Sequence, residues 1–328
     1  MEYKQQVIAL QAWYDQYHRD LCFRKDRDPY HIWVSEVMAQ QTQIVTMTPY
    51  YLRWMEQFPT IEALHQANIE QVLMLWHGLG YYTRARNLKK GADTIMEDYG
   101  GTMPKTYQDL LKIPGIGPYI AAAIASICYD EPITAIDGNV NRVVARLLTL
   151  DEYMGTNAFK KQVEATTSKW MDHAIPHIFS QSLMELGALV CTPKNPRCEI
   201  CPLQEWCQGK KDPLVYPKRK VKAKSPTWLY HVHLYYCDHH LAIQRPPYVD
   251  HLMEGYYRFP MESVDAALDT PYFIKHVYSH LIWQLYGVVE PVETMDPYYL
   301  WVDIDTLKND YPLVIAHKKL LMTIDNWQ

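Results

Sequence analysis

The chain has 328 residues, of which 48% are hydrophobic and 21% charged, so it is long enough for two domains with separate cores. It contains no apolar run near twenty residues, which excludes a membrane-spanning helix, and its polar start does not have the pattern of a signal peptide. The net charge of −5 excludes a simple polycation, but residues 227–328 carry −7, with six Lys or Arg against thirteen Asp or Glu. The remaining +2 on residues 1–226 makes the N-terminal part the better candidate for binding a nucleic acid.

Helical spacing of apolar residues dominates the first part of the chain. It predicts helices over residues 7–17, 31–48, 61–76, 87–99 and 159–190, and no convincing strand before residue 207. Glu36 lies in the second of these helices and is followed by Gln40-Gln41-Thr42. A glutamate among apolar helix residues is most often a surface residue at the helix edge. Two adjacent glutamines, however, offer amide donors and acceptors to a base or to a gap in a duplex.

Two glycine-containing stretches predict tight turns suited to nucleic-acid contact. Gly78-Leu79-Gly80-Tyr81-Tyr82 is weak evidence alone, but it is followed by Arg84 and Arg86, so stacking rings and phosphate-seeking cations gather in one loop. Pro114-Gly115-Ile116-Gly117 predicts a turn between two helices, because its glycines stand two residues apart. Outward amides in such a turn, together with the start of the next helix, suit a phosphate.

Asp137 follows this turn by about twenty residues and stands just before another amphipathic helical pattern, in Asp137-Gly138-Asn139. On these residues alone, the simpler interpretation is a helical hairpin followed by an Asp or Asn that caps the next helix.

Four of the seven cysteines are concentrated in one stretch, with the spacing Cys191-x6-Cys198-x2-Cys201-x5-Cys207. Without a secretion signal, this pattern indicates a metal centre and not a disulfide framework. Four thiolates in a compact loop suit either a tetrahedral zinc ion or a cubane 4Fe–4S cluster. Zinc ribbons usually pair two Cys-x2-Cys units, and the ferredoxin run has a different spacing, so the spacing alone leaves both centres open.

The composition changes after the cysteines. Residues 208–226 contain three prolines and seven Lys or Arg, which predicts a basic linker. Beyond it, segments rich in Tyr, Val, His and Trp predict strands over 229–234, 241–243, 282–289 and 300–302, with a final helix over about 312–327. We therefore expect a multi-domain protein, with an all-α domain over 1–207 and an α+β domain over 227–328.

Together these motifs resemble the helix–hairpin–helix DNA glycosylases of the endonuclease III superfamily. The resemblance is carried by residues 33–42, 78–82, 114–117 and 136–139 and by the cysteine loop 191–207, and it covers about residues 5–210 densely. It implies a helix–hairpin–helix glycosylase domain in which Cys191, Cys198, Cys201 and Cys207 hold a 4Fe–4S cluster. Tyr119 stands where endonuclease III-like members carry the lysine that forms a Schiff base and nicks the strand, which implies a glycosylase without true lyase activity.

Within the superfamily, the pattern is similar to that of the members that excise adenine. The resemblance implies hydrolysis of the N-glycosidic bond of adenine mispaired with 8-oxoguanine or guanine in double-stranded DNA, after the base is flipped. Adenine leaves poorly unless protonated and the sugar develops positive charge, so two carboxyl groups are needed, by analogy with glycoside hydrolysis. We assign Glu36 as the acid, kept protonated by burial, and Asp137 as the stabilising carboxylate, kept ionised by the helix start.

The resemblance also implies roles for neighbouring residues. Tyr119 and Asn139 are expected beside the sugar and the catalytic water, Phe23 and Arg24 in the adenine pocket, and Gln41, Thr42, Leu79, Tyr81, Gly115 and Gly117 against DNA. Phe23 departs from the family, which usually has tryptophan there; it keeps an aromatic wall but loses an N–H donor.

The C-terminal half resembles a Nudix fold more thinly, through residues 241–245 and 255–260. It lacks the glutamate-rich Nudix box, so we infer no pyrophosphohydrolase activity. Tyr278-Ser279-His280 stands where the family has Phe-Ser-His, which implies that Ser279 and His280 recognise the lesion; an ordinary turn is the alternative. We expect a monomer in a bacterial-type cytoplasm, associated with the nucleoid and without membrane contact.

Two other functions fit part of the pattern. An endonuclease III-like glycosylase and lyase acting on oxidised pyrimidines is disfavoured by Tyr119 and by the additional C-terminal domain. A non-catalytic iron–sulfur DNA-binding protein would not need both Glu36 and Asp137.

Overall fold

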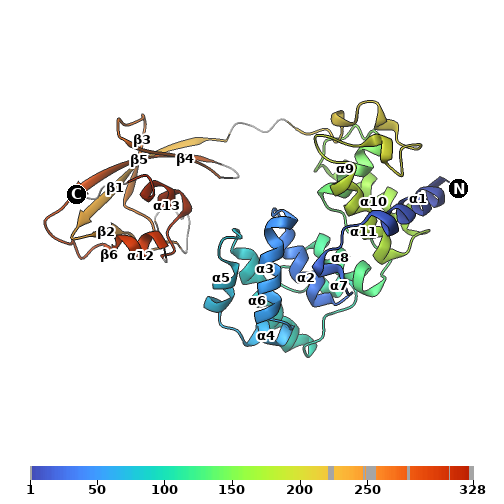
Figure 1. The fold of residues 1–328 in the computed structure, drawn as a ribbon, viewed down its shortest axis with the longest axis horizontal. Coiled ribbons are helices and arrows are strands. Elements are labelled where there is room, and N and C mark those ends of the chain that lie inside the picture. Colours follow the sequence, from blue (N-terminus) through green and yellow to red (C-terminus); the bar gives the residue numbers. More distant parts are fainter. Residues whose placement is uncertain are drawn as a thin grey trace. The chain divides into compact units, whose positions relative to one another are not determined.

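The computed structural model describes residues 2–220, 225–246, 248, 256–278, 281–309 and 311–324. The chain forms two compact units, unit 1 over Met1–Lys220 and unit 2 over Val221–Gln328 (Figure 1). Each unit has its own apolar core. No helix in the described part is long and apolar enough to cross a membrane. Ser279 and His280, the expected lesion-recognition pair, lie outside the described residues.

Unit 1 is helical, and its described residues contain no strand, as the sequence predicted. Its α-helices are α1 (Glu2–Tyr17), α2 (Pro29–Ala39), α3 (Ile44–Gln57), α4 (Ile61–Gln66), α5 (Ile69–Trp76), α6 (Thr83–Tyr99), α7 (Tyr107–Leu110), α8 (Pro118–Tyr129), α9 (Gly138–Leu147), α10 (Asn157–Met171) and α11 (Pro176–Leu189). Short 3-10 turns are η1 (Cys22–Arg24), η2 (Cys198–Ile200), η3 (Gln208–Lys210) and η4 (Pro213–Val215). The largest fully buried side chains of this unit are tryptophans: Trp33, Trp54, Trp76 and Trp170.

Three of the predicted helices are interrupted. The predicted helix over 31–48 divides into α2 and α3 because Gln41 adopts a left-handed conformation with φ of 57°. The stretch 61–76 divides where Asn68 forms a capping box with Gln71 at the start of α5. The stretch 159–190 divides before Pro176, which begins α11. The first break matters most, because it moves Gln41 out of a helix and into an exposed turn.

The predicted hairpin lies between α7 and α8. Gly115 has φ of 82°, and an added Cβ would stand 2.7 Å from the Cβ of Asn87, so both conformation and space require glycine. Gly115 and Gly117 are exposed, and α8 begins directly after them at Pro118. The turn therefore presents backbone groups and a helix start to solvent.

The segment after the cysteines belongs to unit 1. The Met154 amide donates to the Lys218 carbonyl over 2.8 Å, and Arg146 donates to the Tyr216 carbonyl over 3.1 Å. An added Cβ on Gly209 would stand 2.4 Å from the Arg146 carbonyl oxygen, so this segment packs closely on α9. The predicted linker over 208–226 is thus shorter than expected, since its residues up to Lys220 are packed in unit 1.

Unit 2 is built on a six-stranded mixed sheet, consistent with a Nudix-like domain. Its strands are β1 (Thr227–Cys237), β2 (His240–Ile243), β3 (Met261–Val264), β4 (Tyr272–Val277), β5 (Ile282–Pro291) and β6 (Leu300–Asp303), and its helices are α12 (Ile304–Asn309) and α13 (Ile315–Leu321). The order is β4-β5-β1-β2-β6, with β3 paired to β1. Strands β1 and β5 are parallel, and the other pairs are antiparallel. The four predicted strand regions are present as β1, β2, β5 and β6; β3 and β4 were not predicted.

Alternate residues of β1 face opposite sides of the sheet. Tyr230, Val232 and Leu234 are buried in the core of unit 2, which also contains Leu320 of α13. The residues between them, including His231 and His233, face the other side and are only half-buried.

Candidate active site

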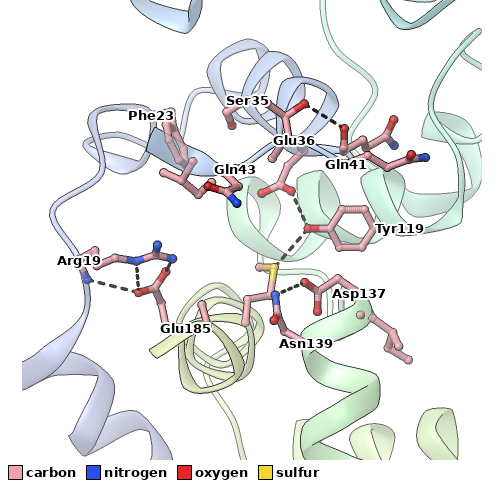
Figure 2. A pocket seen from close by; sticks show the side chains of 18 of the residues that line it. Arg19, Phe23, Ser35, Glu36, Gln41, Gln43, Tyr119, Asp137, Asn139 and Glu185 are labelled. Atoms are coloured by element: carbon pink, nitrogen blue, oxygen red, sulfur yellow. Dashed lines mark hydrogen bonds and ion pairs between the residues drawn. The ribbon is translucent and has the colours of Figure 1, made fainter. Parts of the chain in front are cut away.

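A cavity of about 1040 Å³ in unit 1 brings together most of the site residues that the sequence singled out. Its walls come from η1, from α2 and the turn that follows it, and from the starts of α8 and α9 and the middle of α11 (Figure 2). The predicted residues that line it are Phe23, Arg24, Glu36, Gln41, Thr42, Tyr119, Asp137 and Asn139. Leu79, Tyr81, Gly115 and Gly117 do not line it; they lie on two other turns of the same unit.

Glu36 is held at the wall of this cavity by Tyr119. The Tyr119 hydroxyl donates to Glu36 Oε2 over 2.6 Å, and Met184 Sδ lies 3.3 Å from the same hydroxyl (Figure 2). Glu36 is only 5% exposed because α2 is buried along nearly its whole length, including every residue from Ile32 to Met38. The side chain of Tyr119 is thus a phenol that fixes the Glu36 carboxyl group.

Asp137 is the N-cap of α9. Its Oδ1 accepts from the Val140 amide over 2.8 Å, and its Oδ2 accepts from Asn139 Nδ2 over 2.7 Å. Arg142 holds the other end of the Asn139 amide, since its Nη2 donates to Asn139 Oδ1 over 2.7 Å. The simple interpretation from sequence, a helix cap, is therefore confirmed; the same carboxylate also faces the cavity.

Glu36 is more deeply buried than Asp137, which is half-buried, and the two carboxyl groups accept from different donors. Burial is the largest influence on Glu36 and raises its pKa above the usual value, while Arg24 and the Tyr119 hydroxyl act against this rise. Burial also raises the pKa of Asp137, against the opposing hydrogen bonds from Val140 and Asn139. The raised pKa of Glu36 agrees in direction with the expectation that burial favours its protonated form. The pKa of Asp137 is also raised, so this carboxyl group is less readily ionised than its helix-cap position suggested, because the cavity wall encloses it. Asp137 accepts hydrogen bonds from Val140 and Asn139, and Glu36 accepts one from Tyr119; each of these bonds favours the ionised form of its acceptor.

A buried ion pair next to these residues was missed by the sequence analysis. Glu185 of α11 is 1% exposed and accepts from Arg19 Nη2 over 2.6 Å and from Arg24 Nη1 over 3.2 Å. Burial acts to raise the pKa of Glu185, but the two guanidinium groups outweigh it and hold the pKa below its usual value. Its sequence signal was a carboxyl inside the apolar run Leu183-Met184-Glu185-Leu186. The pair fixes Arg24, the expected adenine-pocket residue, beside Phe23.

The two turns that carry Gln41 and Tyr81 are joined by a single side chain. Arg84 Nη1 donates to the carbonyls of Val37, Met38 and Gln40, and its Nη2 donates to those of Leu79 and Gly80 and to the Thr42 hydroxyl. Gln41 and Tyr81 have φ of 57° and 50°, a conformation that side chains other than glycine rarely adopt. Both are exposed, so Arg84 maintains two strained, projecting residues on one surface.

The four clustered cysteines line one small cavity of about 30 Å³ next to α9. No three of their sulfurs lie within 4.8 Å of one another. A tetrahedral zinc with bonds of about 2.3 Å requires sulfurs about 3.8 Å apart, so the spacing favours a larger centre such as a cluster. Arg146 Nη1 lies 3.4 Å from Cys191 Sγ and supplies positive charge to it.

Comparison with known families agrees with this geometry. Residues 34–173 match the model of the HhH-GPD superfamily of base excision DNA repair proteins. Unit 1 contains an HhH-GPD domain. Residues 191–207 match the iron–sulfur binding domain of endonuclease III, so the expectation of an iron–sulfur centre in place of zinc is confirmed. The HhH-GPD domain includes Glu36, Tyr119 and Asp137.

Curated relatives are similar to about three fifths of this chain. The chain is 44% identical over 209 residues to an adenine DNA glycosylase of Rattus norvegicus, covering 61% of this chain and 40% of that protein. It is 42% identical over 211 residues to the adenine DNA glycosylase of Homo sapiens, covering 62% and 39%. An adenine DNA glycosylase of Buchnera aphidicola subsp. Schizaphis graminum is 36% identical over 219 residues, covering 64% and 62%. The chain thus spans about two fifths of the length of the two mammalian relatives.

Solved structures share the fold of the HhH-GPD domain. A thermostable thymine-DNA glycosylase has a TM-score of 0.56 at 23% identity, covering 64% of this chain and 98% of that one. An endonuclease III in a non-covalent DNA complex has a TM-score of 0.54 at 24% identity, covering 63% and 96%.

Proposed function

We propose that this protein is a monofunctional DNA glycosylase that hydrolyses the N-glycosidic bond of adenine mispaired with 8-oxoguanine or guanine. The observation that carries the proposal is the pairing of Glu36 and Asp137 on one cavity, with Tyr119 bonded to Glu36. A non-catalytic DNA-binding protein has no need for two enclosed carboxyl groups that face the same space. The names of the curated relatives support adenine as the excised base.

The geometry supports an acid and a cation-stabilising group in this mechanism. Glu36, whose pKa is raised by burial, donates a proton to the adenine ring as the glycosidic bond breaks. Asp137 stabilises the oxocarbenium-like sugar, and it is positioned by the Val140 amide and Asn139. Asn139 and Tyr119 lie beside the two carboxyl groups, where they orient the sugar and the attacking water. Tyr119 has no amine, so no Schiff base forms and the strand is not nicked.

Double-stranded DNA is the partner that the exposed features suit. The target base must leave the stack, at a cost of a few kcal/mol. Gln41 and Tyr81 project from the turns joined by Arg84, so we assign them to the gap in the duplex, with Thr42 and Leu79 adjacent. The exposed amides of Gly115 and Gly117 bind a backbone phosphate. Ser279 and His280 are proposed to recognise the base opposite the adenine. We further propose that the protein acts as a monomer in a bacterial-type cytoplasm, associated with the nucleoid.

The cysteine loop is proposed to hold a 4Fe–4S cluster through Cys191, Cys198, Cys201 and Cys207. Bound there, the cluster supplies a covalent cross-link for a loop that has little core of its own. It would supply no reacting group for hydrolysis; its loop reaches Asp137 only through Arg142, which bonds the Cys191 carbonyl and Asn139.

The test is base release from a duplex that carries adenine opposite 8-oxoguanine. Strand cleavage should occur only after hot alkali. Glu36→Gln and Asp137→Asn should each reduce single-turnover release by about 10²–10⁴-fold and leave mispair binding largely intact. The exposed Glu70→Gln and Asp98→Asn on α5 and α6 are matched controls that should act like the wild type. Cleavage without alkali would favour a lyase, and binding without any release would favour a non-catalytic protein.

A further inference from the structure

Unit 2 contains a cluster of histidine and glutamate side chains that the proposed glycosylase activity does not use. One ring nitrogen each from His231 and His233 and one carboxylate oxygen of Glu290 all lie within 4.8 Å of one another. No other group of three His, Cys, Asp or Glu in the described part of the chain brings its ligand atoms so close. The cluster therefore differs from an ordinary ion pair, because it brings three possible metal-ligand atoms together instead of two charged groups.

The sheet register explains why these side chains meet. His231 and His233 are two residues apart on β1, so both point away from the core of unit 2. Their rings lie 4.1 Å apart between centroids. Glu290 lies on the neighbouring strand β5, opposite Tyr235 of β1. Glu262 lies on β3, opposite His231 of β1. Both carboxylates therefore reach the same face of the sheet from opposite sides of β1.

The contacts place carboxylates on both sides of the histidine pair. His233 Nδ1 lies 2.6 Å from Glu290 Oε1. Glu262 Oε1 lies 3.6 Å from His231 Nδ1 and 3.7 Å from His233 Nε2. The Nε2 atom of His231 is buried and has no hydrogen-bond partner among the described residues. A ring nitrogen left without a partner in a cluster of this composition points to a missing ligand.

We propose that His231, His233 and Glu290 bind one divalent transition-metal ion, with Zn²⁺ as the best match, and that Glu262 supports the site from β3. Two imidazoles and one carboxylate are a ligand set that zinc uses in proteins, with the fourth position open to water or to another carboxylate. Mg²⁺ and Ca²⁺ are poor matches because they take oxygen ligands.

The observed spacing is compatible with such an ion. Tetrahedral zinc with bonds of about 2.0–2.1 Å needs ligand atoms about 3.4 Å apart. His233 Nδ1 and Glu290 Oε1, now 2.6 Å apart, therefore have to separate by less than about an ångström, while a ligand atom near the 4.8 Å limit has to move closer by a similar distance. Glu290 and the two histidines are only partly buried, with side chains 37%, 21% and 19% exposed, and can make this adjustment. The ion takes the place of the direct contact between His233 and Glu290 and joins side chains of β1 and β5.

The cysteine loop is the competing zinc site, so the experiment must separate the two. The full-length protein is dialysed against micromolar Zn²⁺, and iron and zinc are counted per chain by elemental mass spectrometry. Zinc-edge X-ray absorption then reports the ligands, because zinc–nitrogen and zinc–oxygen bonds are about 2.0–2.1 Å and zinc–sulfur bonds about 2.3 Å.

The wild type is expected to hold one zinc with only nitrogen and oxygen ligands and an unchanged iron content. His233→Gln and Glu290→Gln should each weaken zinc binding by at least about tenfold. His276→Gln on β4 is the matched control, because its ring lies next to Lys319 and has no carboxylate partner in the described residues. Absence of zinc in the wild type, zinc with sulfur ligands, or equal zinc binding in His233→Gln and His276→Gln would each overturn the proposal.

Discussion

Arg84 offers a direct test of how the turns that carry Gln41 and Tyr81, the proposed DNA contacts, are held in place. Its guanidinium group reaches six acceptors at distances between 2.7 and 3.4 Å: two carbonyls at the end of α2, the Gln40 carbonyl and Thr42 hydroxyl on the turn that carries Gln41, and two carbonyls on the turn that carries Tyr81. Arg84 Nη1 has two protons for three carbonyls, so about four full hydrogen bonds are formed at once. Burial lowers the pKa of Arg84, and its ring contacts with Trp76 and Tyr81 compensate for part of the lost hydration.

The informative change is Arg84→Lys. Lysine keeps the charge, but its single ammonium group reaches one turn and not both. About two hydrogen bonds are then lost, at about 1 kcal/mol each, so the arrangement of the two turns should weaken by about 2 kcal/mol. If both turns contact DNA, this corresponds to about 30-fold weaker binding of a mispaired duplex.

The assay is fluorescence anisotropy with adenine opposite 8-oxoguanine, performed in a Glu36→Gln background so that the duplex stays intact. Arg86→Lys is the matched control, since Arg86 is exposed on the same helix. Hydrogen exchange at residues 40–43 and 79–82 should rise in Arg84→Lys alone. Binding of Arg84→Lys equal to that of Arg86→Lys would refute the idea that Arg84 organises a DNA-binding surface.

Three further changes test the site. Glu36→Gln should raise the thermal midpoint more at pH 8 than at pH 5: a buried carboxyl with a raised pKa gives its full contribution to stability below its unfolded pKa and loses it as the pH rises. An equal change at both pH values, measured by calorimetry, would contradict that burial. Tyr119→Lys should add strand nicking and a borohydride-trapped DNA complex, and failure to trap the complex would count against the position of residue 119 beside the sugar. Arg146→Ala should lower iron per chain, because Arg146 donates to the carbonyls of Thr192 and Pro193 over 2.7 and 3.0 Å, whereas the exposed Lys211→Ala should retain full iron.

The parts of the site that the sequence predicted are those fixed by local rules. Asp137 precedes an amphipathic helix and caps it, and Gly115 stands where only glycine fits. Glu36 could be placed on a helix but not in a cavity, because its enclosure depends on Tyr119, 83 residues away. The contact between Glu36 and Tyr119 is a tertiary contact, and it leaves no periodic pattern in the sequence.

The missed features share the same origin. Glu185 pairs with Arg19 across 166 residues, and Arg84 reaches carbonyls up to 47 residues away, so neither leaves a pattern in a short window. The predicted helix over 31–48 was wrong at Gln41 for a related reason. Its apolar spacing continues through the break, and the left-handed turn is stabilised from outside by Arg84 bonds to the Gln40 carbonyl and the Thr42 hydroxyl.

Helix α9 connects the cysteine loop, which supplies no reacting group, to the cavity that contains Asp137. Arg142 donates from Nε to the Cys191 carbonyl over 2.7 Å and from Nη2 to Asn139 Oδ1 over 2.7 Å, and Asn139 in turn donates to Asp137 over 2.7 Å. The carboxylate is thus oriented by a side chain whose other end is anchored in the loop. Loss of order at Cys191 would free Arg142 and, through Asn139, let Asp137 rotate. Because a small displacement of a catalytic group is costly, the cysteine loop would support the proposed hydrolysis by fixing the position of Asp137 from a distance.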